Sequence, residues 1–275
     1  MQRLTAANHV TSMHWSPQAD RRPVTDGRIY TRSVPTLEID GLAIHYESHG
    51  SGPAILIPRC NFPWSSLDVG LLAAHYTVVI ASPRGFGESD RTATGYSAAT
   101  IRSDLEAVLD HLGVDEYVAF GYSMTGAIAP WLGHGNPRVR AVVSGGFPTA
   151  TSYSKVLPLI INNLSDTRKD PALWTATTTE CDPDAVLAWY RELDKFSAGA
   201  LVDHLDCPVY SYWAADDEVI EEVVGLETLR NAMLKRGLPF EVFPSRDHGG
   251  LLEDINSAVP GILQWLQSTV APIPA

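Results

Sequence analysis

The chain has 275 residues and a formal net charge of −12, with 45% apolar and 19% charged residues. This composition is typical of a globular protein with one large core, and it excludes a largely disordered chain. The acidic balance also excludes a general binder of nucleic acid or of an anionic membrane surface, because phosphate groups bind clustered positive charge.

No stretch reaches the roughly 18 consecutive apolar residues that a membrane-spanning helix needs. The first 20 residues lack the continuous apolar run of a secretory signal. The three cysteines, Cys60, Cys181 and Cys207, are too few and too scattered for a disulfide framework or a zinc site. We therefore expect a cytoplasmic protein that holds no metal.

In chain order, residues 1–35 are polar and aperiodic, which indicates an N-terminal arm lying on the surface. Short apolar runs then favour strands at 36–39, 43–47, 54–57, 77–81, 117–120, 139–144, 208–214 and 240–243. Helical spacing is present at 97–112, 127–133, 218–234 and 257–269. Strands that alternate with helices predict an α/β fold, in which a mostly parallel central sheet is flanked by helices on both faces.

Residues 148–205 interrupt this alternation with a helical stretch that contains Trp174, Trp189, Tyr190 and Phe196. We expect this stretch to be an inserted helical cap over the carboxyl edge of the sheet, where ligands bind in such folds. Residues 36–147 and 206–275 would then form the core domain.

The sharpest signal is the strand 117–120 running into Gly121-Tyr122-Ser123-Met124-Thr125-Gly126, with a helix after it. An abrupt turn from strand to helix holds its apical residue in a strained backbone conformation, and glycines let the chain pass close to itself. The apical hydroxyl of Ser123 would project above the sheet at the start of a helix. Free N–H groups there favour an oxyanion.

This segment resembles the nucleophile elbow of the α/β-hydrolase fold superfamily, Gly-x-Ser-x-Gly in a strand–turn–helix context. Thr125 stands where the second glycine usually is, so we expect the turn to open slightly. The resemblance implies a serine nucleophile and no cofactor. It also argues against haloalkane dehalogenases and epoxide hydrolases of this fold, which carry an aspartate at the apex.

The resemblance implies an acid and a base downstream, in the chain order Ser, Asp, His. Asp217 follows the strand 208–214 at the family's position for the acid, with Asp216 as the alternative. Asp216 would otherwise be a loop carboxylate or a helix cap. His248 lies after the strand 240–243, where the family carries its catalytic histidine.

The family often has His-Gly-x-Pro after its first core strand, whereas this chain has Pro58-Arg59-Cys60-Asn61. The N–H of Met124 and that of Cys60 or Asn61 would form the oxyanion hole, because a backbone donor needs no particular side chain. Arg59 would bind a carboxylate of the substrate. The alternative is that it pairs with a local acid or points to solvent.

Tyr122, Trp174 and Trp189 are the further candidates for substrate binding. The alternative for the aromatic residues of 148–205 is that they form the cap's own small core. A second family landmark is altered at residues 82–90, where Ser82 replaces an aspartate. We expect that segment to be structural.

These features predict a serine hydrolase that cleaves an ester, lactone or thioester of a mid-sized apolar small molecule through an acyl-enzyme. One alternative is a carbon–carbon bond hydrolase, lyase or cyclase that uses the same three residues. Another is a catalytically silent ligand-binding protein or receptor. We expect no nucleic-acid or membrane partner, and we leave the oligomeric state open, with a homo-oligomer as one option.

Overall fold

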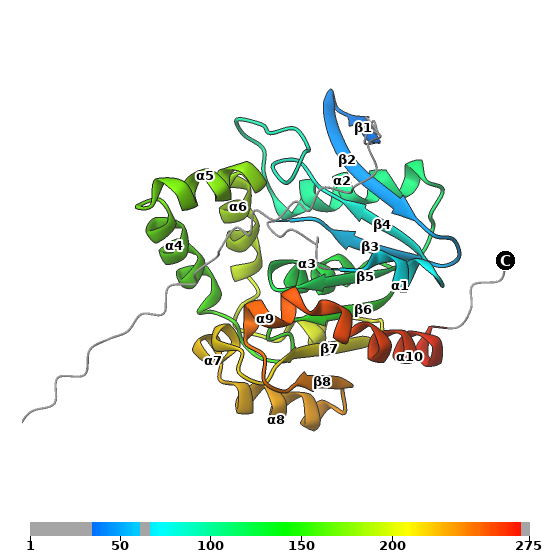
Figure 1. The fold of residues 1–275 in the computed structure, drawn as a ribbon, viewed down its shortest axis with the longest axis vertical. Coiled ribbons are helices and arrows are strands. Elements are labelled where there is room, and N and C mark those ends of the chain that lie inside the picture. The colour runs from blue at the N-terminus through cyan, green and yellow to red at the C-terminus, as the bar shows by residue number, and fades with distance from the viewer. Residues whose placement is uncertain (1–34, 61–66, 271–275) are drawn as a thin grey trace, which may run out of the picture.

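The structure of the chain is a computed structural model that describes residues 35–60 and 67–270. The predicted N-terminal arm lies outside these residues, apart from Pro35. Eight strands of the described part form one sheet in the order β1-β2-β4-β3-β5-β6-β7-β8 (Figure 1). They are β1 (Thr36–Ile39), β2 (Leu42–His49), β3 (Ala54–Pro58), β4 (Thr77–Ala81), β5 (Tyr117–Tyr122), β6 (Val139–Gly145), β7 (Val209–Ala214) and β8 (Phe240–Phe243).

The sheet is mostly parallel. β1 pairs antiparallel with β2 and β2 antiparallel with β4, whereas the pairs from β4–β3 through to β7–β8 are parallel. All residues of β3 and β5 are buried, as expected for short apolar strands that are covered on both faces. The predicted α/β fold is confirmed, and the carboxyl ends of six parallel strands lie along one edge of the sheet.

Helices cover both faces of the sheet (Figure 1). The helices in the described residues are α1 (Val69–Ala73), α2 (Ala98–His111), α3 (Met124–Gly133), α4 (Val156–Thr167), α5 (Pro171–Glu180), α6 (Pro183–Asp194), α7 (Glu218–Val223), α8 (Leu226–Arg236), α9 (His248–Glu253) and α10 (Val259–Thr269). Helices α1, α9 and α10 pack in one apolar cluster, and α2 and α3 pack in another on the opposite face. Successive side chains of β7 point to opposite faces of the sheet. Tyr212 packs in the cluster of α1, α9 and α10, whereas Trp213 packs against α8.

The segment predicted to be helical between β6 and β7 forms α4, α5, α6 and the short 3₁₀ helix Leu201–His204. Figure 1 shows α4, α5 and α6 beside one end of the sheet. Asp170 and Asp182 cap α5 and α6, each followed by a proline in the first helical position. Helix α6 buries residues against the core, whereas α5 buries none. The division of the chain into a core and a separate cap stays a prediction.

One predicted helix is divided. The stretch 218–234 forms α7 and α8, with Gly225 between them at φ 84°. That backbone angle lies in the region that glycine adopts readily and that side chains disfavour, so the helix ends there. None of the helices in residues 35–60 and 67–270 is long and apolar enough to cross a membrane.

Candidate active site

The turn between β5 and α3 has the strained geometry that the sequence predicts. Ser123 has φ 57° and ψ −121°, a region that side chains rarely adopt. A Cβ atom added at Gly121 would collide with the backbone of Thr125, and one added at Gly126 would collide with the carbonyl of Gly145. Both glycines are therefore required by close approaches of the backbone.

Thr125, which we expect to open the turn slightly, is held within the turn by its own side chain. Its side chain is fully buried and turns back toward the end of β5. The Oγ1 atom accepts a hydrogen bond from the N–H of Tyr122 and donates one to the carbonyl of Tyr122, both at 2.9 Å. The threonine therefore occupies the glycine position while its hydroxyl is fully hydrogen-bonded to the end of β5.

Three polar side chains from distant parts of the chain meet at the carboxyl edge of the sheet. The Oγ atom of Ser123 lies 2.9 Å from Nε2 of His248. The Nδ1 atom of His248 lies 2.9 Å and 3.0 Å from the two carboxylate oxygens of Asp217. Asp217 is completely buried and His248 is 5% exposed. The arrangement is a hydroxyl, an imidazole and a carboxylate in hydrogen-bonded sequence.

The structure distinguishes the two acid candidates by position. Asp217 contacts His248, and its Oδ1 atom also accepts the N–H of Ile220 as the N-cap of α7. Asp216 is exposed, and its N–H donates to the carbonyl of Arg246. The capping role considered for Asp216 therefore belongs to Asp217. The capping hydrogen bond holds the carboxylate of Asp217 in place beside the imidazole.

Tyr122 was predicted to bind substrate, and the structure places it elsewhere. Its side chain is fully buried in the core cluster beneath the turn, with its ring centroid 5.8 Å from that of Tyr212. Its hydroxyl donates a 2.8 Å hydrogen bond to the carbonyl of His248. The substrate-binding assignment is wrong because strand alternation turns this side chain into the apolar cluster that α1, α9 and α10 cover.

The predicted oxyanion donors are only partly described. Met124 is the first residue of α3, so its N–H has no acceptor within the helix. Cys60 is completely buried after β3, and burial raises the pKa of its thiol well above the ordinary value. The thiol therefore stays protonated and is a poor nucleophile. Asn61 lies outside the described residues.

Arg59 follows β3, and its N–H donates to the carbonyl of Ala81 at 2.7 Å. Its Nη1 atom lies 3.8 Å from a carboxylate oxygen of Glu47 on β2. This contact corresponds to the alternative in which Arg59 pairs with a local acid. The role of Arg59 in binding a substrate carboxylate stays a prediction.

The two predicted tryptophans differ in exposure. Trp189 is completely buried between α6 and α3, with its ring edge-on to Trp131 at 5.2 Å. It belongs to the core, which is the alternative considered for the aromatic residues of this segment, and its assignment to the substrate pocket is wrong. Trp174 on α5 is partly exposed, and the guanidinium of Arg168 lies 4.7 Å from its ring centroid.

A family model for the alpha/beta hydrolase fold matches residues 51–182, which include β3 through α5 and the Ser123 turn. The chain has the α/β-hydrolase fold. A soluble epoxide hydrolase from Corynebacterium sp. strain C12 is 30% identical over 136 residues, which are 46% of this chain and 47% of that protein. The chain spans less than half the length of the first curated relatives that it matches.

Two longer matches cover most of this chain. A non-heme haloperoxidase from Rhodococcus erythropolis is 24% identical over 273 residues, 83% of this chain and 97% of that protein. A thermophilic esterase from Thermogutta terrifontis, with malate bound, is similar in structure with a TM-score of 0.60 and 19% identity. That match covers 86% of this chain and 97% of the esterase. The relatives are enzymes, and the structural likeness shows the fold.

The site also requires two glycines that are not among the residues predicted from the sequence. Gly145 and Gly146 follow directly on the predicted strand 139–144. A Cβ at Gly145 would collide with the rings of Tyr212 and Tyr122, and one at Gly146 would lie 3.0 Å from Cε1 of His248. Gly146 also has φ 58°. A Gly-Gly pair at the carboxyl end of a predicted strand was the available signal for close packing.

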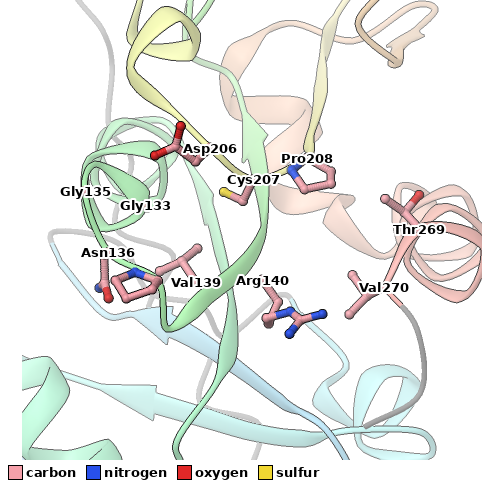
Figure 2. Close-up of a pocket in the computed structure, with 11 residues that line it drawn as sticks. Gly133, Gly135, Asn136, Val139, Arg140, Asp206, Cys207, Pro208, Thr269 and Val270 are labelled. Atoms are coloured by element: carbon pink, nitrogen blue, oxygen red, sulfur yellow. The ribbon is translucent and has the colours of Figure 1, made fainter.

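A cavity of about 550 Å³ lies away from this site (Figure 2). It is lined by residues around the end of α3, the starts of β6 and β7, and the end of α10. Because β5, β6 and β7 are parallel, their amino ends lie at the opposite edge of the sheet from Ser123. This cavity therefore does not belong to the candidate active site.

Proposed function

We propose that the protein is a serine hydrolase that cleaves an ester, lactone or thioester of a mid-sized apolar small molecule through an acyl-enzyme. The observation that carries this proposal is the hydrogen-bonded sequence of Ser123, His248 and Asp217, with all three contacts between 2.9 and 3.0 Å. These are the roles and geometry that nucleophilic acyl transfer needs.

In the proposed first step, the Oγ atom of Ser123 attacks the substrate carbonyl while its proton passes to Nε2 of His248. Asp217 accepts a hydrogen bond from Nδ1, which fixes the tautomer and stabilises the imidazolium. His248 then gives the proton to the leaving group. The acyl group remains on Ser123.

In the second step, His248 removes a proton from water, which attacks the acyl-enzyme and releases the acid. The N–H of Met124 at the start of α3 and that of Cys60 or Asn61 receive the negative charge on the carbonyl oxygen. One such donor contributes about 3 kcal/mol to stabilising the transition state in a related mechanism. No step in this sequence requires a cofactor.

An apolar substrate is supported by the residues that join the turn to the inserted helices. Met124, Phe147, Tyr153 and Val156 belong to one apolar cluster, with the rings of Phe147 and Tyr153 5.5 Å apart. This cluster connects α3 with α4, beside the carboxyl edge where Ser123 lies. The residues on this side of the turn are therefore apolar, which favours an apolar acyl group.

Similarity to an epoxide hydrolase does not carry that reaction over to this chain. The residue at the apex of the turn is Ser123, whereas epoxide hydrolases of this fold carry an aspartate there. A serine hydroxyl forms an ester with a carbonyl substrate, and the neighbouring imidazole activates water to cleave it. The esterase with a similar structure is the more relevant comparison.

The first experiment uses a fluorophosphonate probe, which phosphonylates serines that a neighbouring base activates. We expect labelling of the wild-type protein and no labelling of the Ser123→Ala variant. The matched control is Ser268→Ala, which removes an exposed hydroxyl on α10 and should leave labelling unchanged. A wild-type protein that stays unlabelled would refute the proposal and favour the ligand-binding alternative.

The second experiment measures hydrolysis of p-nitrophenyl esters and lactones with acyl chains of increasing length. We expect kcat/KM to rise with chain length up to a mid-sized acyl group, because each buried methylene contributes about 0.8 kcal/mol. Labelling without hydrolysis of any ester, lactone or thioester would instead support the carbon–carbon hydrolase, lyase or cyclase alternative.

A further inference from the structure

We propose that Tyr122 is a positioning residue that holds the main chain of His248, so that the imidazole stands between Asp217 and Ser123. This inference rests on the proposed function, and it assigns a role to the residue immediately before the nucleophile. Two consecutive residues would then have complementary roles: Ser123 supplies the attacking hydroxyl, and Tyr122 holds the histidine that acts as its base.

The contact between the two residues is buried and short. The phenol oxygen of Tyr122 lies 2.8 Å from the carbonyl oxygen of His248, and the side chain of Tyr122 has no exposed surface. The two rings are also adjacent, with centroids 5.1 Å apart. Gly146 allows this approach, because a Cβ there would lie within 3.0 Å of both rings.

His248 is held at every polar group that it has. The carbonyl accepts from Tyr122, and the N–H donates to a carboxylate oxygen of Glu218 at 3.1 Å. The two ring nitrogens contact Asp217 and Ser123. The two main-chain contacts fix the position of the Cα and Cβ atoms of His248. The two ring contacts require that this position be correct within a fraction of an ångström.

The direction of the hydrogen bond is fixed by the chemistry of its partners. A carbonyl oxygen only accepts, so the phenol must be the donor. Burial, reinforced by the negative charge of Asp217, raises the pKa of Tyr122 well above its ordinary value. The phenol therefore keeps its proton at any pH at which the enzyme is assayed.

Tyr212 provides a matched control for this bond. It is also a fully buried tyrosine of the same cluster, with its ring centroid 5.8 Å from that of Tyr122. Its hydroxyl has no hydrogen-bond partner in the described part of the chain. Tyr122→Phe and Tyr212→Phe therefore remove the same atom from the same core, and only the first change removes a contact with His248.

The experiment compares the two variants by steady-state kinetics, by fluorophosphonate labelling and by proton NMR, at a temperature well below the melting temperature of each. For Tyr122→Phe we expect kcat to fall about tenfold, equivalent to roughly 1.4 kcal/mol, which is the scale of one hydrogen bond. KM should change less than about twofold, since substrate binding is untouched. The rate of fluorophosphonate labelling should fall in parallel with kcat, whereas Tyr212→Phe should leave all three values near wild type.

Proton NMR provides a further measurement that needs no substrate turnover. The proton that Nδ1 of His248 shares with Asp217 gives a far-downfield resonance in the proton NMR spectrum. We expect Tyr122→Phe to shift or broaden this resonance and Tyr212→Phe to leave it in place. A merely structural loss of stability would lower the melting temperature without moving the resonance of the folded protein.

The outcomes separate this inference from the proposed function. A wild-type protein without labelling would overturn the proposed function, and the resonance would still report the position of His248. Labelling of the wild type together with equal kcat and an unchanged resonance in both variants would overturn the role of Tyr122. A rise in KM at constant kcat in Tyr122→Phe would also overturn it, because that result belongs to a substrate contact.

Discussion

Thr125 is the residue at which this chain departs from the family's turn, and replacing it by valine isolates the contribution of its hydroxyl. Valine has nearly the same shape, so the Thr125→Val variant keeps the packing and removes one oxygen. That oxygen makes two 2.9 Å hydrogen bonds, one from the N–H and one to the carbonyl of Tyr122. The side chain is fully buried, so water does not replace either bond.

The cost follows from what is left unpaired. A buried donor without an acceptor costs about 1–3 kcal/mol, and the N–H of Tyr122 becomes such a donor in Thr125→Val. Loss of the second bond adds about 1 kcal/mol. We therefore expect the free energy of unfolding to fall by about 2–4 kcal/mol, which lowers the melting temperature by roughly 4–16 °C for a chain of this size.

Urea denaturation measures this change as a lower midpoint at an unchanged slope m. The matched variant Thr125→Ser keeps the hydroxyl and loses one methyl group, so it should cost only about 1 kcal/mol. A Thr125→Val protein as stable as wild type, with Thr125→Ser the more destabilised of the two, would refute the reasoning. Packing of the methyl group would then explain the threonine.

Three further predictions address other parts of the molecule. Asp217→Asn should lower kcat by about 10⁴-fold while the melting temperature changes little, because asparagine can still cap α7, whereas Asp216→Asn should keep kcat within about twofold of wild type. Arg84→Met should lower the free energy of unfolding by about 3–5 kcal/mol in urea denaturation, because it leaves the fully buried carboxylate of Asp104 without its bidentate partner. Arg140→Met removes an exposed pair with Glu116 and should cost less than about 1 kcal/mol. Iodoacetamide at neutral pH should alkylate the native protein at Cys207 alone, as read by mass spectrometry, because Cys207 is partly exposed whereas Cys60 and Cys181 are fully buried. Burial raises the pKa of all three thiols, so labelling of Cys207 should be slow, and rapid native labelling of Cys60 would contradict its burial.

The strands of the core were predictable because their residues are apolar on both faces. The ranges 36–39, 77–81 and 240–243 coincide with β1, β4 and β8, and the remaining predicted strands differ from the observed ones by one or two residues at their ends. A short strand that is buried on both faces appears in the sequence as a continuous apolar run bounded by turn-forming residues, which is easy to recognise. The helix predicted at 218–234 failed at Gly225, because helical spacing continues across a residue whose backbone angle ends the helix.

The residues of the candidate site could be predicted where each directly follows a strand, and the prediction failed where the direction of a side chain depends on tertiary packing. Ser123, Asp217 and His248 each follow a predicted strand, and the carboxyl ends of parallel strands share one edge. The neighbours were harder to assign. Tyr122 directly precedes Ser123 and Trp189 lies in the predicted cap, yet both side chains are buried in the core. Which face of a strand or helix an aromatic side chain occupies depends on what packs against it, and residue type alone does not contain that information.

The threonine in the turn shows what the family's small residues are for. Glycine is required where backbone faces backbone, and in this chain those positions are Gly121 against Thr125 and Gly126 against Gly145. At position 125 the side chain turns back toward the end of β5, where a hydroxyl finds both a donor and an acceptor on Tyr122. On the helix side of the turn, the position that requires glycine in this chain is Gly126. The altered motif preserves the close approach of strand and helix, and it adds two hydrogen bonds to the residue that precedes the nucleophile.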